Sequence, residues 1–487
     1  MFWKNIFKQT KKMKVKITAF ILGISIFLSQ GISSYAVVDY NELAEQRKNL
    51  PIQSNSYENW PDGPAIGAEA AILMDVNSGT ILYEKNIHEM LYPASTTKIM
   101  TCLLAVENCA MDEMVEFSYD AVFSVPRDGS NMGIDVGEIL PMEDCLYGIL
   151  VGSANEVAAA VGEHIAGDTD SFIEMMNQRA KELGCLNTNF VNANGLHDDN
   201  HYTTAYDLAL IARAFFSNEY LANISNTARV HFEPTDTQPD DFYLNNKNKL
   251  VSGEIKYEYY LGGKTGYTTE ARQTLVSCAE KDGMRLVCVI MKEETPNQFN
   301  DTVTLFNYGF SNFKEVNVSE VETKYTIENT GFFSTGQDIF GSSKSILQLD
   351  GDACIVIPTG AEFEDVESSI NYENLSDDQV ATIEYTYNDV FVGSVSVNLA
   401  SNTDNYEFTS ASVSNSSMTI VNVKKVVIWI IVIAALLSFV FFAFRYVNQY
   451  HFGGKKGRLA KKRRRKKTQA IRSPYRHFNF DDIDLRK

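Results

Sequence analysis

The sequence lacks the cysteine patterns that mark metal-binding and disulfide-rich proteins. Its seven cysteines are an odd number, lie scattered along the chain and include no Cys-x-x-Cys pair. No group of His, Cys and carboxylate residues has metal-ligand spacing, so we expect no metal and no other cofactor. Most cysteines occur in apolar runs and are predicted to be buried thiols, although Cys278 and Cys288, on two neighbouring predicted strands, could pair.

Basic residues are also in short supply. The chain has 43 Lys and Arg against 62 Asp and Glu, a formal net charge of −19. Much of the basic charge lies at the two ends, because residues 445–487 have a net charge of +12 and residues 1–36 contain six lysines and no acid. Residues 37–444 therefore carry −37, and a surface this acidic excludes nucleic acid as a partner.

Both ends of the chain carry segments that predict export and membrane anchoring. Residues 4–16 are basic, residues 17–28 are apolar and Ser34-Tyr35-Ala36 matches a cleavage site, so residues 1–36 are predicted to be a cleaved signal peptide rather than an uncleaved anchor. Residues 426–444 are apolar and uncharged, which predicts a transmembrane helix. The basic residues 445–487 predict a cytoplasmic tail, which places the rest of the protein on the extracytoplasmic face of the cell membrane.

The chain between these segments is predicted to fold as an α+β domain followed by a small β-rich domain. Residues 37–59 are a polar leader expected to lie on the surface, residues 60–315 form the larger domain, residues 316–400 form the β-rich domain, and residues 401–425 are a linker rich in Ser, Asn and Thr. In the larger domain the predicted strands are 70–75, 80–84, 259–265, 274–279 and 285–291, and predicted helices include 142–151, 156–165, 172–183 and 208–216. Strands at both ends with helices between them indicate an antiparallel sheet packed by a helical cluster.

The stretch Tyr92-Pro-Ala-Ser-Thr-Thr-Lys-Ile-Met100 carries the first candidate for catalysis. A helix is predicted to begin at or just before Ser95, which puts Ser95 and Lys98 on one face, one turn apart. A serine hydroxyl needs a base beside it to act as a nucleophile, and a lysine can be that base when burial lowers its pKa. The alternative is a capping serine followed by a solvated lysine, and Ser311 with Lys314 shows that this spacing also occurs by chance.

Two further motifs follow in order along the chain. Ser153-Ala154-Asn155 comes between two predicted helices, and Lys264-Thr265-Gly266 lies on a predicted strand. Each has a structural alternative: Ser153 could only cap the next helix, Asn155 could be a turn residue, and Lys264 and Thr265 could be ordinary strand residues. The ordered trio of Ser-x-x-Lys, Ser-x-Asn and Lys-Thr-Gly is nevertheless the pattern of β-lactamases and penicillin-binding proteins.

The sequence resembles the low-molecular-mass penicillin-binding proteins, which are serine-type D-Ala-D-Ala carboxypeptidases. The resemblance covers about residues 60–313 closely and extends beyond the trio to Asn194-Gly-Leu196, Tyr202-Thr-Thr-Ala-Tyr-Asp207 and Gly263-Lys-Thr-Gly-Tyr-Thr268. It implies the penicillin-binding-protein/β-lactamase-like transpeptidase fold and a substrate that is a peptidoglycan stem peptide ending in D-Ala-D-Ala. It also implies acylation by β-lactam antibiotics.

The resemblance also implies a role for each motif residue. Ser95 attacks the carbonyl between the two D-alanines, Lys98 takes its proton, and Ser153 relays a proton to the leaving D-alanine. Backbone N–H groups of Ser95 and Tyr267 would form the oxyanion hole. The implied substrate-binding residues are Asn155, Lys264, Thr265, Gly266 and Tyr267. Asn194 and Asp207 are interpreted mainly as structural loop and cap residues.

Two departures from related patterns bear on the alternatives. Ala154 stands where β-lactamases often carry Asp, and no Glu-x-x-x-Asn-type segment supplies a deacylating carboxylate. Both weaken the hypothesis of a β-lactamase on the same scaffold. The predicted transmembrane span also differs from the amphipathic anchor helix common among relatives. A non-catalytic cell-wall-binding protein is the third hypothesis, which four intact catalytic-type residues disfavour.

Overall fold

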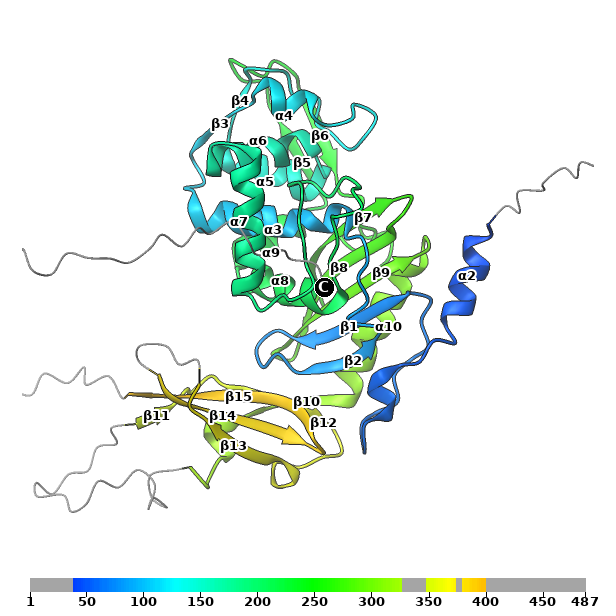
Figure 1. Ribbon diagram of the computed structural model, residues 1–487, viewed down its shortest axis with the longest axis vertical. Coiled ribbons are helices and arrows are strands. Elements are labelled where there is room, and N and C mark those ends of the chain that lie inside the picture. Colours follow the sequence, from blue (N-terminus) through cyan, green and yellow to red (C-terminus); the bar gives the residue numbers. More distant parts are fainter. Residues whose placement is uncertain (1–37, 326–346, 374–378, 400–487) are drawn as a thin grey trace, which may run out of the picture. The chain divides into compact units, whose positions relative to one another are not determined.

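A five-stranded antiparallel sheet forms the centre of this computed structural model, which describes residues 38–325, 347–373 and 379–399 (Figure 1). The strand order is β2-β1-β9-β8-β7. The strands are β1 (Ala70–Asp75), β2 (Ile81–Lys85), β7 (Tyr260–Thr268), β8 (Arg272–Lys281) and β9 (Met284–Glu293). The predicted strands are confirmed, and consecutive ones form hairpins, since β1 pairs with β2 and β8 pairs with β9, in each case antiparallel. Strand β7 lies at the edge of the sheet.

Helices cover the two faces of the sheet. On one face α8 packs on β1 and β9 and α3 packs against α6 and α8, whereas α10 covers the other face against β8 and β9. The helices are α3 (Lys98–Asn108), α4 (Tyr119–Phe123), α5 (Met142–Tyr147), α6 (Asn155–Ala166), α7 (Thr169–Glu182), α8 (Ala205–Phe216), α9 (Glu219–Ser225) and α10 (Asn297–Asn312). The predicted α+β class with a helical cluster is therefore observed.

The sheet separates two hydrophobic cores because its side chains alternate between faces. In β9, Val287 and Val289 join the core under α3, α6 and α8, while Leu286 and Ile290 join the core under α10. The same alternation decides the question of a Cys278–Cys288 bond. Cys278 lies opposite Val287 in the register and belongs to the first core, Cys288 belongs to the second, and both are free thiols.

The described part of residues 316–400 is rich in strands, as predicted. Residues Asn388 and Asp389 have φ of 48° and 63°, which suits the tight turn between β14 and β15. The strands form a four-stranded sheet in the order β11-β15-β14-β13 and a pair β10-β12. They are β10 (Phe313–Asn317), β11 (Leu347–Leu349), β12 (Cys354–Pro358), β13 (Glu367–Asn371), β14 (Gln379–Tyr387) and β15 (Val390–Leu399), with α11 (Val318–Val321) after β10.

Small hairpins complete the fold, and one expectation about the leader is wrong in part. Strands β3 (Met114–Glu116) and β4 (Ile139–Pro141) pair, as do β5 (Arg229–Phe232) and β6 (Phe242–Asn245). The polar leader forms α2 (Tyr40–Arg47) and the 3-10 turn η1 (Gln53–Ser56). It does not simply lie on the surface, because Ala44 and Ser54 are fully buried and Arg47 donates to the Gly67 carbonyl at 2.8 Å.

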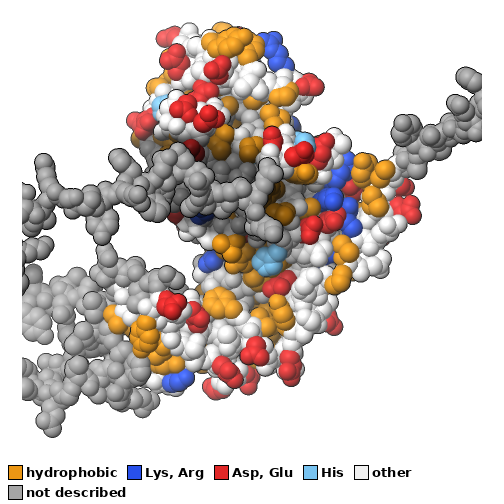
Figure 2. Space-filling model, in the orientation of Figure 1, with side chains coloured by type: hydrophobic (Ala, Val, Ile, Leu, Met, Phe, Trp, Pro, Cys, Tyr) orange, Lys and Arg blue, Asp and Glu red, His pale blue; other side chains and the backbone are white. Residues whose placement is uncertain are grey.

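The predicted signal peptide, linker, transmembrane helix and tail lie outside the described residues. Within the residues that the structure does describe, no helix is long and apolar enough to cross a membrane. Acidic side chains are scattered over the face drawn in Figure 2 rather than gathered in one patch. This distribution agrees with the acidic composition of the region between the two basic ends.

Candidate active site

Ser95 lies in a 3-10 turn, η2 (Ala94–Thr97), that leads directly into α3 at Lys98. The turn begins with Ala94 at a positive φ of 49°, and two hydroxyls hold it: Thr96 donates to the Pro93 carbonyl at 2.7 Å and Thr97 to the Ala94 carbonyl at 2.8 Å. Ser95 keeps partial exposure, whereas Lys98 is fully buried. The sequence therefore fixes a strained, hydroxyl-braced turn that presents one serine to solvent.

The Lys98 amine contacts the neighbouring Ser95 and two groups from distant parts of the chain. Its Nζ lies 3.1 Å from Ser95 Oγ, 2.7 Å from Asn155 Oδ1 and 2.6 Å from the Asn194 carbonyl oxygen. Burial lowers the pKa of Lys98 well below its ordinary value, and the nearby positive charge of Lys264 lowers it further. A lysine in this position loses its proton more readily than a solvated lysine.

Ser153 and Asn155 flank the start of α6. Helix α5 ends in a π-helical turn, η3 (Gly148–Gly152), and Ser153 follows it in the left-handed region at φ 62°. This conformation is uncommon for a residue other than glycine, and strained residues of this kind cluster at functional sites. Ser153 Oγ accepts from Lys264 Nζ at 3.0 Å, so the second and third motifs meet directly.

Lys264 reaches Ser153 from β7, the edge strand of the sheet. Its Nζ also donates to the Thr265 carbonyl at 2.9 Å. Burial, and then the charge of Lys247, lower the pKa of Lys264 to about 7. Gly266 lets β7 come close to the nucleophile turn, because a Cβ at this position would lie 2.9 Å from the Ser95 nitrogen and 2.3 Å from Thr274 Oγ1.

Residues of the first two motifs, and the two residues that follow the third, border a pocket of about 300 Å³. Ser95, Asn155 and Tyr267 line it together with residues that the sequence analysis did not single out, and Tyr267 is half exposed at its rim. The remaining lining residues are Asp128, Gly129, Ser130, Gly195, Leu196, Lys247 and Thr268. The structure thus brings Ser95, Lys98, Ser153, Asn155 and Lys264 into one hydrogen-bonded site, and Gly266 and Tyr267 against it. Thr265 lies beside them on β7.

The sequence contains no signal that would place Lys247 in this pocket. It is exposed, it donates to Ser130 Oγ at 2.8 Å, and it lies in a polar stretch between β6 and β7 without any helical or strand periodicity. Ser130 in turn is held beside Asn155, whose backbone N–H donates to the Ser130 carbonyl at 2.9 Å. An exposed lysine therefore lines the pocket in addition to the buried lysines of the site.

The interpretation of Asn194 as a structural loop residue missed the contact of its backbone carbonyl with Lys98. Its side chain is structural, since Oδ1 accepts from the Leu196 N–H at 3.0 Å, but its carbonyl is a partner of Lys98. Gly195 has a φ of 80° and packs so tightly that a Cβ would lie 1.9 Å from the Ala94 oxygen. Asp207 is structural as expected, accepting from the Asn187 N–H and from Thr188 Oγ1.

A serine, a buried lysine beside it and a second buried lysine on the edge strand define an acyl-transfer site with a serine nucleophile. The comparisons agree. The family model of D-alanyl-D-alanine carboxypeptidases, peptidase family S11, matches residues 57–295. The D-alanyl-D-alanine carboxypeptidase DacC of Escherichia coli (strain K12) is 31% identical over 313 residues, 62% of this chain and 74% of that protein. The chain therefore belongs to the D-alanyl-D-alanine carboxypeptidase family of serine-type hydrolases.

Further relatives give the extent of the similarity. The D-alanyl-D-alanine carboxypeptidase DacF of Bacillus subtilis (strain 168) is 36% identical over 254 residues, which are 51% of this chain and 63% of that protein. The match thus spans less than two thirds of the B. subtilis relative. The crystal structure of penicillin binding protein 5 from Haemophilus influenzae superimposes with a TM-score of 0.54 at 26% identity, covering 70% of this chain and 98% of that chain.

Proposed function

We propose that this protein removes the terminal D-alanine from peptidoglycan pentapeptides through an acyl-enzyme on Ser95, and that β-lactams acylate the same serine. The observation that carries the proposal is the contact of Lys98 Nζ with Ser95 Oγ at 3.1 Å inside a buried site. Because the chain belongs to this enzyme family, the remaining question is how its own residues perform the reaction.

The partners of Lys98 support its role as the general base. A neutral amine has two N–H donors and one lone pair. The carbonyl oxygens of Asn155 and Asn194 can each accept one N–H, which leaves the lone pair for the Ser95 hydroxyl proton. When Ser95 attacks the carbonyl between the two D-alanines, its proton passes to Lys98 and the C–O bond of the ester forms.

Ser153 and Lys264 support the departure of D-alanine. The Ser153 hydroxyl, which accepts a hydrogen bond from Lys264 Nζ, passes a proton to the leaving amine as the C–N bond breaks, and the proton that Lys98 took from Ser95 replaces it. The Lys264 cation compensates the charge that develops on Ser153. We assign the terminal carboxylate of the substrate to this side of the pocket, with Thr265 and Lys247 as further donors. Water then attacks the ester, the free stem peptide leaves, and Ser95 regains its proton.

Strand β7 supplies the template for the substrate backbone. It is the edge strand, and the turn that carries Ser95 packs beside it. An extended peptide can therefore pair with β7 as an additional strand, which brings its carbonyl to the N–H groups of Ser95 and Tyr267 as an oxyanion hole. The signal-peptide and transmembrane patterns of the sequence support a membrane-anchored enzyme that meets this substrate outside the cytoplasm.

The test is D-alanine release from a peptide ending in Lys-D-Ala-D-Ala by the full-length protein. We expect release by the wild type and none by Ser95→Ala. The matched control is Ser311→Ala, because Ser311 has a lysine three residues later but lies exposed at the end of α10, and this variant should release D-alanine like the wild type.

Each other outcome has a defined meaning. Folded protein that is acylated by penicillin but releases no D-alanine would contradict the carboxypeptidase proposal and direct attention to cross-linked peptides or amine acceptors. Penicillin turnover within seconds rather than a stable adduct would favour a β-lactamase. Neither acylation nor release would leave a non-catalytic cell-wall-binding protein.

A further inference from the structure

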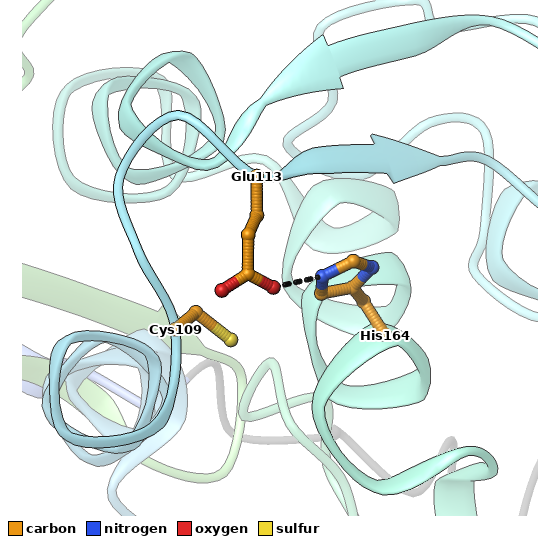
Figure 3. Close-up of side chains that lie close together, drawn as sticks. All are labelled: Cys109, Glu113 and His164. Carbon is orange, nitrogen blue, oxygen red and sulfur yellow. Dashed lines mark hydrogen bonds and ion pairs between the residues drawn. The ribbon is translucent and has the colours of Figure 1, made fainter.

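Three side chains of different donor type converge on the side of the helical cluster remote from Ser95. The sulfur of Cys109, a carboxylate oxygen of Glu113 and a ring nitrogen of His164 all lie within 4.8 Å of one another. In Figure 3 they point toward a common space from the end of one helix, from the turn before β3 and from a second helix. Cys109 is a free thiol and half-buried.

Existing contacts already orient two of the three groups. His164 Nε2 and Glu113 Oε2 are 3.1 Å apart, and the other Glu113 oxygen accepts from the Ala110 N–H at 2.6 Å. The side chains of His164 and Glu113 are 25% and 44% exposed, so an ion can enter from solvent. The backbone fixes one Glu113 oxygen and leaves the other facing the imidazole, so an ion entering between them would replace the present contact of Glu113 with His164.

The separations suit a small tetrahedral ion. Around Zn²⁺, with Zn–S near 2.3 Å and Zn–N or Zn–O near 2.0 Å, neighbouring ligand atoms are about 3.3–3.6 Å apart. Atoms that all lie within 4.8 Å of one another reach this geometry by side-chain movements of about 1 Å. One sulfur, one nitrogen and one oxygen donor is a set that favours zinc over the hard ions magnesium and calcium.

We propose that Cys109, Glu113 and His164 bind one zinc ion, with a fourth coordination position open to solvent. Sequence spacing could not show this site, because Cys109 and His164 are 55 positions apart and meet only through the packing of α3 against α6.

The position of the site gives the ion a mechanical role. Lys98 is the first residue of α3 and Asn155 the first residue of α6, and they are hydrogen-bonded to each other. Cys109 directly follows α3, and His164 lies in the last turn of α6. The two helices are thus joined at one end by the catalytic contact, and the ion would join them at the other end, about 16 Å away along α3. It would also tie in the turn that leads to β3.

The test is metal binding by the full-length protein, freed of metal with a chelator and then titrated with ZnCl₂ and, separately, with CoCl₂. We expect one zinc per chain, a rise in Tm with zinc, and a thiolate-to-cobalt charge-transfer band in the near ultraviolet. Cys109→Ser should abolish the band, and both Cys109→Ser and His164→Ala should weaken binding by about 100-fold or more, since even the loss of outer partners costs 10–100-fold.

The matched control is His231→Ala, which removes an exposed histidine that also pairs with a carboxylate, Asp241, away from this cluster. It should bind zinc like the wild type. Penicillin acylation of each variant checks that it is folded, so loss of binding cannot be attributed to unfolding. Wild-type protein that binds no stoichiometric zinc, or binding that survives both Cys109→Ser and His164→Ala, would overturn the proposal and leave a simple His–Glu ion pair.

Discussion

Two buried lysine sites in this protein have the same burial and opposite surroundings. Lys98 and Lys85 are both fully inaccessible to solvent. Burial lowers the pKa of both, that of Lys85 to about 8. The neighbours of Lys85 include Glu293 and Asp301, which oppose the shift, whereas the neighbour of Lys98 is the cation of Lys264, which adds to it.

The hydrogen-bond partners of the two lysines also differ. Lys85 Nζ donates to the carbonyls of Arg47 and Ile66 at 2.8 and 2.7 Å, and so fastens the N-terminal segment to β2. Lys98 also has two oxygen acceptors, but its third neighbour is a serine hydroxyl at the pocket. Burial therefore lowers the basicity of both lysines, and the serine hydroxyl beside Lys98 is what distinguishes the proposed catalytic lysine from the structural one.

The largest expected effect is on the rate of acylation when Lys98 is replaced by methionine, compared with the same replacement of Lys85. Lys98→Met should slow acylation by a fluorescent penicillin by about 10³-fold or more, because general bases contribute 10²–10⁴-fold. Lys85→Met, its matched control, should acylate within about twofold of the wild type. Equal rates for both variants would show that Lys98 is not the base.

Lys264→Ala should have the next largest effect. It removes the cation beside Ser153, so acylation should slow by about 10²-fold, the cost of losing one preorganised electrostatic partner. Stopped-flow acylation at saturating and subsaturating penicillin separates rate from binding. A change in binding alone would mean that Lys264 holds the substrate carboxylate without aiding the chemistry.

Lys85→Met should instead reduce stability. Two buried backbone carbonyls lose their donor, and leaving buried acceptors unsatisfied costs about 2 kcal/mol or more in the free energy of unfolding. Chemical denaturation followed by tryptophan fluorescence measures this, because Trp60 lies in the core near the N-terminal segment. A Lys98→Met protein that lost as much stability would weaken the contrast between anchor and catalyst.

An exposed lysine extends the comparison. Lys247→Ala should raise KM for the D-Ala-D-Ala peptide by about tenfold with little change in kcat, because a charge-assisted hydrogen bond at a pocket rim contributes about 1.5 kcal/mol to binding. Steady-state D-alanine release measures both parameters. A fall in kcat with unchanged KM would place Lys247 in the chemical step instead.

The smallest effect is a change in pH profile. Lys98 has to be neutral and Lys264 charged, so kcat/KM of the free enzyme should rise as Lys98 loses its proton and fall as Lys264 loses its proton, from about pH 7 upward. Lys264→Arg should lose the alkaline limb, since arginine keeps its proton. An unchanged alkaline limb in this variant would assign it to another group.

Local signals explain what the sequence could predict. The strands 70–75 and 80–84, the continuous apolar run in β9 and the serine of the η2 turn each depend on neighbouring residues, and their elements were found within a few positions. The motif residues around Ser95 could be proposed for the same reason, because each motif is a short contiguous string.

What the sequence could not predict depends on packing between distant segments. Lys247 and the Asn194 carbonyl reach the site from stretches without periodicity, and the π-helical turn that aims Ser153 has no sequence signal of its own. The strands β5 and β6 have only four residues each, too short a pattern to stand out from the polar stretch around them. Cys109 and His164 meet only because two helices run side by side.

The two faces of the central sheet are under different selection, one for the site and the other for stability. Residues on the face of Cys278 support the helices that carry Lys98 and Asn155, while residues on the face of Cys288 pack against α10. Substitutions on the second face can accumulate until the protein's lifetime in the cell suffers, without altering what the enzyme recognises. Stability and catalysis can therefore change independently during evolution, because neighbouring residues of the same strand face opposite sides of the sheet.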